Sequence, residues 1–275
     1  MKLEWIDKAI ELYKKDYSFL KIGRELGVDR KKVSRELNKL GYSAKYSFAT
    51  TGGVERKYDV WRKYTFNENF FAEIDCEEKA YWLGFLYADG YVNANKTSVE
   101  LSLQEKDKEH LEMFRESVGS NAPLSLHSKN LDGKEYKIYR ITLNSLKFKT
   151  DLVNKGCVEN KSHVLKFPSY DIVPKDMMRH FIRGYIDGDG CWYKNSGGRL
   201  SLEVLGTEEF LVGMCNELDI HQNTIYNLRH KDKETITKRV GYHGLYAKKI
   251  FNKLYDNSNI FLKRKHSKAK ICMPS

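Results

Sequence analysis

The stretch Tyr81-Trp-Leu-Gly-Phe-Leu-Tyr-Ala-Asp-Gly90 occurs a second time, in altered form, as Phe181-Ile-Arg-Gly-Tyr-Ile-Asp-Gly-Asp-Gly190. The first copy is apolar and has two small residues, Gly84 and Ala88, four positions apart; the second copy has glycine at both places. Because residues four apart share one face of a helix, the spacing predicts two helices with a narrow smooth stripe along one side. Two such stripes facing each other would let the helix backbones approach closely.

Each copy ends in Asp-Gly, and glycine is typical of the left-handed residue that stops a helix. If the two helices pack side by side in parallel, Asp89 and Asp189 meet at their C-terminal ends. Two carboxylates beside the negative ends of two helix dipoles repel each other unless a cation lies between them. Oxygen ligands of this kind suit Mg²⁺. The alternative is a pair of ordinary core helices, which leaves the repeated terminal aspartate unexplained.

The repeated stretch resembles the LAGLIDADG motif, and residues 66–270 resemble a single-chain LAGLIDADG homing endonuclease with two motifs. The resemblance implies an α+β fold of two pseudo-symmetric αββαββα halves, whose antiparallel sheets form one saddle over the major groove of DNA. It also implies that the backbone carbonyls of Ala88 and Gly188 complete the Mg²⁺ shells, where Mn²⁺ is expected to substitute. Cleavage across the minor groove would leave short 3′ overhangs.

After each motif the hydrophobic period changes from helical to alternating, which predicts strands. In the first half the expected strands are 91–94, 98–104, 124–128 and 136–143, and the expected helices are 107–118 and 145–154. In the second half they are strands 191–193, 200–205, 224–229 and 236–240, and helices 207–218 and 244–255. The predicted boundaries are 70–170 for the first LAGLIDADG half and 171–275 for the second.

The N-terminal residues 1–45 predict a separate helix-turn-helix DNA-binding domain. Asp29 is placed to cap a third helix, whose Val33, Leu37 and Leu40 are expected to face the core. The residues expected to face the major groove or its phosphates are Arg30, Lys31, Ser34, Arg35 and Asn38. The alternative is a three-helix protein-interaction module with a solvated basic face. Residues 46–69 predict a basic linker, which either follows the phosphate backbone or is simply solvated.

Composition favours a nucleic-acid partner. The 275 residues contain 48 Lys plus Arg against 37 Asp plus Glu, a net charge of +11, together with 18 tyrosines. No apolar run is long enough for a membrane span, and Glu4 and Asp7 interrupt any signal peptide, so a cytoplasmic protein without a membrane partner is expected. The five cysteines form no C-x-x-C pair and are expected to be reduced thiols.

Hydrolysis of a phosphodiester also requires positive charge near the crowded phosphate. In the family a basic residue after the third helix of each half reaches into the active site, and the resemblance places this role on Lys161 and Lys265. Lys263 is the rival in the second half, and the alternative for all three is an ordinary surface charge.

Alternating positions on the predicted strands supply donors for phosphates and guanine edges. These candidate DNA contacts are Lys137, Tyr139, Arg140, Arg199, Tyr226, Arg229, His230, Lys231 and Lys238. Taken singly, each residue is better interpreted as a solvated surface residue or a phosphate contact than as a base reader.

Two residues depart from the family pattern. Tyr87 stands where the first aspartate of the motif often lies, while Asp187 keeps that aspartate; the position is expected to be structural. Arg183 stands where a small residue is common and is expected to loosen or tilt the second helix. With both terminal aspartates present, the sequence predicts a monomeric, Mg²⁺-dependent endonuclease that cuts double-stranded DNA at a long asymmetric site. The alternatives are a DNA-binding regulator without cleavage and an RNA maturase on the same scaffold.

Overall fold

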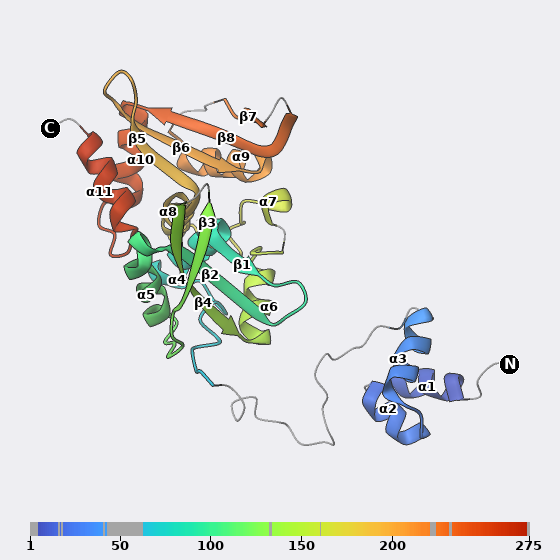
Figure 1. Ribbon diagram of the computed structural model, residues 1–275. Coiled ribbons are helices and arrows are strands. Elements are labelled where there is room, and N and C mark those ends of the chain that lie inside the picture. Colours follow the sequence, from blue (N-terminus) through green and yellow to red (C-terminus); the bar gives the residue numbers. More distant parts are fainter. Residues whose placement is uncertain are drawn as a thin grey trace. The chain divides into compact units, whose positions relative to one another are not determined.

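The computed structural model describes residues 5–15, 17, 19–40, 42, 63–131, 134–159, 161–220, 224–230 and 233–273. The chain divides into two compact units, one ending at Lys63 and one beginning at Tyr64 (Figure 1). Within the described ranges, no helix combines the length and the apolar character that a membrane span requires.

The first unit contains three helices, α1 (Trp5–Lys14), α2 (Phe19–Leu26) and α3 (Arg30–Lys39). Their small core consists of Ala9, Phe19, Ile22, Val33 and Leu37. The predicted cap of the third helix is confirmed.

That cap is formed by Asp29, whose side chain accepts a hydrogen bond of 2.8 Å from the Lys31 amide. Gly27, in the turn before it, has a φ of +63°, which glycine adopts without steric cost. One core prediction is wrong: Leu40 is 53% exposed, because it lies just beyond the last turn of α3 and no neighbouring helix covers it among the described residues.

The second unit repeats one order of elements, as predicted. The first half contains α4 (Glu77–Asp89), β1 (Gly90–Val92), β2 (Ser98–Gln104), α5 (Lys108–Ser117), β3 (Ser125–Leu131), β4 (Lys134–Asn144) and α6 (Leu146–Asn154). The second half contains α8 (Met178–Asp189), β5 (Gly190–Lys194), β6 (Leu200–Gly206), α9 (Glu208–Leu218), β7 (Tyr226–His230), β8 (Lys233–His243) and α10 (Leu245–Tyr255). Three short elements were not predicted: the 3₁₀ helix η2 (Glu105–Asp107), α7 (Lys161–Val164) and α11 (Lys263–Cys272).

The two four-stranded sheets are antiparallel and have equivalent strand orders, β1-β2-β4-β3 and β5-β6-β8-β7. Helices cover one face of each sheet: α5 and α6 contact β2, and α9 and α10 contact β6 and β8. In β2, for example, Val99 and Leu101 are buried under helices, while the alternate residues Glu100 and Ser102 face the open side. The α+β architecture of two similar halves is confirmed.

The helices α4 and α8 pack directly against each other between the halves (Figure 1). A Cβ atom on Gly84 would lie 1.9 Å from the carbonyl oxygen of Phe181, and one on Gly184 would lie 2.0 Å from that of Tyr81. The backbones therefore touch where the glycine positions predicted a smooth stripe. Only glycine fits at these two contacts.

The predicted conformation at the helix ends is wrong. Gly90 has φ −69° and ψ 148°, and Gly190 has φ −85° and ψ 152°, so both are extended and start a strand. Glycine is needed there for space: a Cβ on Gly90 would lie 2.6 Å from the Leu86 carbonyl oxygen, and one on Gly190 would lie 2.5 Å from that of Ile186. Each helix thus passes into a strand without a turn, which fixes the direction of the final aspartate.

Gly184→Ala is expected to destabilise the second unit, because its methyl group would collide with the backbone of α4. Overpacking of this kind costs about 1–3 kcal/mol or more. The matched control is Gly197→Ala, in an exposed turn, where the nearest atom lies 3.4 Å from the new methyl group. Urea denaturation measures both variants, and equal transition midpoints would contradict the close packing of α4 and α8.

Candidate functional site

Asp89 and Asp189 are the last residues of α4 and α8, and the close packing of these helices brings them together. The Oδ2 atom of Asp89 lies 3.5 Å from the point that a Cβ on Gly188 would occupy. The two carboxylates therefore occupy one small region at the parallel C-terminal ends of two helices. Both residues retain solvent-exposed surface there.

Protein atoms packed around these two carboxyl groups remove much of their hydration. Burial raises the pKa of Asp189 to about 6, and the nearby charge of Asp89 adds to the increase. Burial also raises the pKa of Asp89, although the positive charges of Lys265 and Lys161 oppose it. An added cation at this place would relieve the repulsion.

Two lysines reach the same helix ends from equivalent places in the two halves. Lys161, at the start of α7, donates hydrogen bonds of 2.8 Å to the Leu86 carbonyl and 2.5 Å to the Ala88 carbonyl. Lys265, in the first turn of α11, donates to the Ile186 carbonyl at 3.3 Å and to the Gly188 carbonyl at 2.5 Å.

Burial lowers the pKa of both ammonium groups, and the two motif aspartates oppose that effect. The rival Lys263 points elsewhere: it is exposed and forms an ion pair with Glu109. The structure therefore places Lys265, and not Lys263, beside the carboxylates.

The ligand set suits a hard divalent cation. It consists of the carboxylates of Asp89 and Asp189 and the carbonyls of Ala88 and Gly188, all of them oxygen donors. No group of three or more His, Cys, Asp or Glu side chains with metal-binding geometry occurs in the described part of the chain. The protein would thus offer two carboxylates and two carbonyl oxygens to a cation, and water or a phosphate would supply any remaining ligands.

Residues 87 and 187, two positions before the final aspartate of each motif, have structural contacts in both halves. The Tyr87 hydroxyl donates to the Lys155 carbonyl, and burial raises the pKa of this tyrosine far above its usual value. Asp187 is fully buried and accepts hydrogen bonds from Tyr81, Tyr255 and the Leu262 amide.

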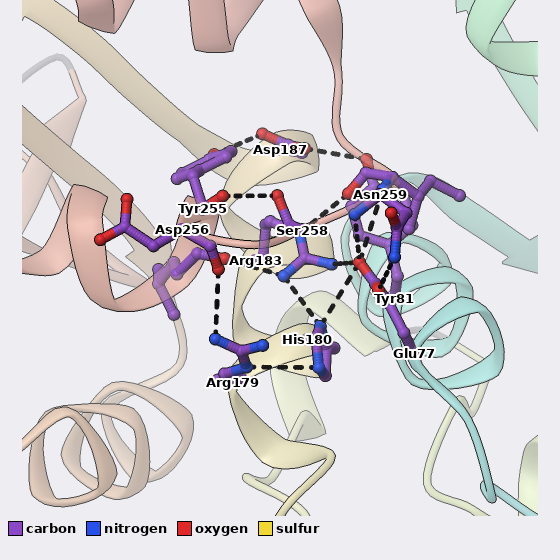
Figure 2. Close-up of polar contacts among 12 residues, drawn as sticks. Glu77, Tyr81, Arg179, His180, Arg183, Asp187, Tyr255, Asp256, Ser258 and Asn259 are labelled. Carbon is purple, nitrogen blue, oxygen red and sulfur yellow. Dashed lines mark hydrogen bonds and ion pairs between the residues drawn. The ribbon is translucent and has the colours of Figure 1, made fainter.

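The expectation that Arg183 loosens the second helix is wrong. Its guanidinium is fully buried and donates to Glu77 at 2.6 Å, to the Leu254 carbonyl at 2.8 Å and to the Ile260 carbonyl at 2.9 Å (Figure 2). The network could not be predicted from the sequence, because its members are far apart in the chain; the available signal was an arginine within the otherwise apolar stretch 181–186.

The open face of the first sheet contains only part of the predicted set. Arg140 lies on it, 3.2 Å from Glu100. Tyr139 does not: it shares the strand parity of the buried Ile141, packs on the core and lies beneath Lys108. The prediction that Tyr139 faces outward is therefore wrong. Lys137 lies on the same side of the strand as Tyr139, not on the open face, and its side chain is exposed beside Glu105.

In the second sheet Tyr226 is exposed on the open face and pairs across the strands with Arg239, which sequence analysis did not name. Arg239 lies 3.4 Å from Glu203 and is the counterpart of Arg140. Lys238 lies on the same side of β8 as the buried Val240, not on the open face. It donates a hydrogen bond to Asn227 on the edge strand β7.

The other predicted contacts of this sheet lie at its margins. Arg199 is exposed in the turn before β6, and the backbone of Arg229 and His230 lies in β7. Lys231 falls outside the described residues.

Of the five residues predicted in α3, Lys31, Arg35 and Asn38 lie on the side opposite the buried Val33, whereas Arg30 and Ser34 lie nearer the buried Leu37. Of the five, Arg30, Lys31, Arg35 and Asn38 are exposed, and Ser34 is half-buried and accepts a hydrogen bond from Asn38.

Asp189→Asn is expected to unfold at a higher temperature than the wild type at neutral pH, without divalent cations. A carboxyl group whose pKa rises on folding contributes stability below its ordinary pKa of 3.8, and this contribution is lost as the pH rises through about 6. The advantage of the variant is therefore expected to appear between those two values. Thermal denaturation at several pH values measures it. Asp171→Asn, at an exposed position, is the control, and equal behaviour of the two variants would contradict the prediction.

No protein-family model matches the sequence, and no curated protein matches it. Solved structures do match. The homing endonuclease I-WcaI, bound to its DNA recognition sequence, aligns with a TM-score of 0.51 and 14% identity over 78% of this chain and 95% of its own. The LAGLIDADG meganuclease I-AabMI, bound to uncleaved DNA, gives a TM-score of 0.43 and 12% identity over 70% and 87%. Full-length DUF199/WhiA from Thermatoga maritima gives 0.44 and 17% over 76% and 66%. With the two motif helices packed at its centre, the chain has the LAGLIDADG fold, with both motifs in one polypeptide.

Proposed function

We propose that this protein is a site-specific endonuclease that cuts both strands of DNA with Mg²⁺. The observation that carries the proposal is the meeting of Asp89 and Asp189 at two close-packed helix ends, with one half-buried lysine beside each end. Packing alone does not require two carboxylates to lie so close together, because their mutual repulsion and dehydration cost stability. A site that holds a cation explains them.

The residues divide the chemistry between them. Asp89 and Asp189, with the carbonyls of Ala88 and Gly188, would hold Mg²⁺. When bound, the ion would supply a Lewis acid that activates water and neutralises charge on the phosphate. The ammonium groups of Lys161 and Lys265 each have three donors, of which two already bond to carbonyls. The third can donate to a phosphate oxygen as negative charge develops in the transition state.

DNA is the phosphodiester that best fits the rest of the chain. The net charge of +11 favours a polyanion. Arg140 and Arg239 occupy equivalent places on the two open sheet faces, where a glutamate orients each guanidinium. An arginine presented in this way can donate two hydrogen bonds to a guanine edge. I-WcaI, which shares the fold, was solved bound to its DNA recognition sequence.

The two halves differ in sequence although they share one architecture, so we infer that a monomer reads a long site whose two halves also differ. The basic side of α3 would extend this footprint through phosphate contacts.

The wild type is expected to cut a randomised double-stranded DNA library at a discrete site in the presence of Mg²⁺ or Mn²⁺. Asp89→Asn and Asp189→Asn are each expected to abolish cutting, because each removes a carboxylate from the metal ligands. Sequencing of the cleaved ends measures the site, and Asp171→Asn is the control for loss of an exposed carboxylate.

If the wild type binds one sequence tightly and never cuts it, the endonuclease proposal fails and a DNA-binding regulator replaces it. Specific binding of RNA without binding of DNA would instead favour a maturase. Cutting that persists in both asparagine variants would place the catalytic centre elsewhere.

The double variant Arg30→Ala/Lys31→Ala is expected to bind DNA more weakly than the wild type. Log affinity falls as log salt rises, and each lost phosphate contact reduces the magnitude of this slope by about 1. For the double variant the magnitude should therefore decrease by about 2. Titrations at several salt concentrations measure it. The matched control is Lys14→Ala/Lys15→Ala, which removes two exposed charges from the end of α1. An equal change in both variants would show that the basic side of α3 is only solvated.

A further inference from the structure

Residues 256–262 join α10 to α11, and the last four of them, Asn259–Leu262, lead directly into α11. Lys265 lies in the first turn of α11, three residues after Leu262. A helix moves as a rigid body over one turn, so any displacement of Leu262 is passed on to Lys265. Polar groups from both motif helices, α4 and α8, hold this segment (Figure 2).

The outer part of the segment is held by Glu77 and Arg183. The Glu77 carboxylate accepts from the Asn259 amide at 2.8 Å and from the Asn259 side chain at 2.9 Å. Arg183 donates to the Ile260 carbonyl at 2.9 Å and to Glu77 at 2.6 Å. The buried guanidinium of Arg183 is bonded on several sides, so its position is defined, because any displacement would leave N–H donors unpaired.

The inner end of the segment is held by Asp187. Its carboxylate accepts from the Leu262 amide at 2.7 Å, from the Tyr255 hydroxyl at 2.6 Å and from the Tyr81 hydroxyl at 2.8 Å. Asp187 and Leu262 are both buried. One side chain of α8 therefore connects α4, α10 and the residue from which α11 starts.

The first half holds its lysine differently. Tyr87 occupies the place of Asp187, and its hydroxyl donates to the Lys155 carbonyl, six positions before Lys161. Leu83 occupies the place of Arg183. The first half thus has a tyrosine hydroxyl where the second half has a carboxylate that accepts from the start of α11. The first turn of α11 is also held by Asp107, which accepts from Arg264 at 2.7 Å.

We propose that Asp187 is a positioning residue: by accepting the Leu262 amide it places Lys265 at the end of α8, and it thereby governs one of the two strand cuts. The inference rests on the proposed nuclease function. Asp187 touches neither the scissile phosphate nor the Mg²⁺ ligands' oxygens in this scheme, and it acts through Lys265.

Asp187→Ala is expected to lower the single-turnover rate of cutting on one strand by about 10- to 100-fold, because a displacement of about 1 Å of a catalytic group has an effect of that size. Nicked DNA should accumulate, while the affinity for the DNA site changes little. Asp187→Asn keeps an acceptor oxygen and is expected to recover most of the lost rate. A DNA substrate labelled differently on each strand measures the two rates.

A double-mutant cycle separates positioning from general damage. In a Lys265→Met background, Asp187→Ala is expected to cause no further loss, whereas in a Lys161→Met background it should retain its full effect. Equal losses in both backgrounds, equal losses on both strands, or no loss at all would overturn the proposal. If Asp187→Ala shows no cooperative unfolding transition, Asp187→Glu takes its place, because its longer side chain displaces Leu262 while the charge remains.

A second measurement does not depend on cleavage. Nuclear magnetic resonance of the protein alone can follow the exchange of the Leu262 amide and the side-chain ammonium signals of Lys265 and Lys161. In Asp187→Ala the Leu262 amide should exchange faster and the Lys265 ammonium signal should weaken, while the Lys161 signal persists. An unchanged Lys265 signal would overturn the proposal. If the wild type does not cut DNA, the proposed function fails, and this measurement still tests the role of Asp187.

Discussion

The contact between the backbones of α4 and α8 is the constraint on which the rest of the structure depends. Gly84 and Gly184 let each helix touch the other's carbonyl groups, and no larger residue fits there. The contact fixes the distance between Asp89 and Asp189, and it also fixes the spacing of the two sheets, because each helix continues directly into a strand. Core packing and the electrostatics of the site therefore have one origin.

The electrostatics of the site oppose folding and would support the proposed chemistry. Two partly dehydrated carboxylates lie close together, and two half-buried lysines bond to carbonyl groups, so that all four groups carry charge in surroundings that disfavour the charged form. Such arrangements are typical of functional sites, where stability is lost so that charged groups are in place before the substrate binds. The large apolar core around α4 and α8 supplies the stability that makes this arrangement possible.

Local patterns in the sequence were sufficient for much of the fold. The repeated stretch predicted two helices and their contact, strand alternation predicted both sheets, and the spacing around Asp29 predicted a cap. The misses have physical causes. The basic sequence of α11 has little apolar periodicity, and the burial of Tyr139 depends on which side of the strand the helices cover. The partners of Arg183 come from segments that only the folded chain brings together.

The contact of Glu77 with Asn259 has a consequence for modular evolution and for protein engineering. Glu77 belongs to the first half of the chain, and the segment that it holds belongs to the second. The two halves, although similar in architecture, are therefore not interchangeable parts. A chimera that combines one half with the half of another protein would have to transfer this glutamate and Arg183 together, or leave a buried guanidinium without its carboxylate. Complementary charges at the contact between the halves thus make two copies of one architecture dependent on each other.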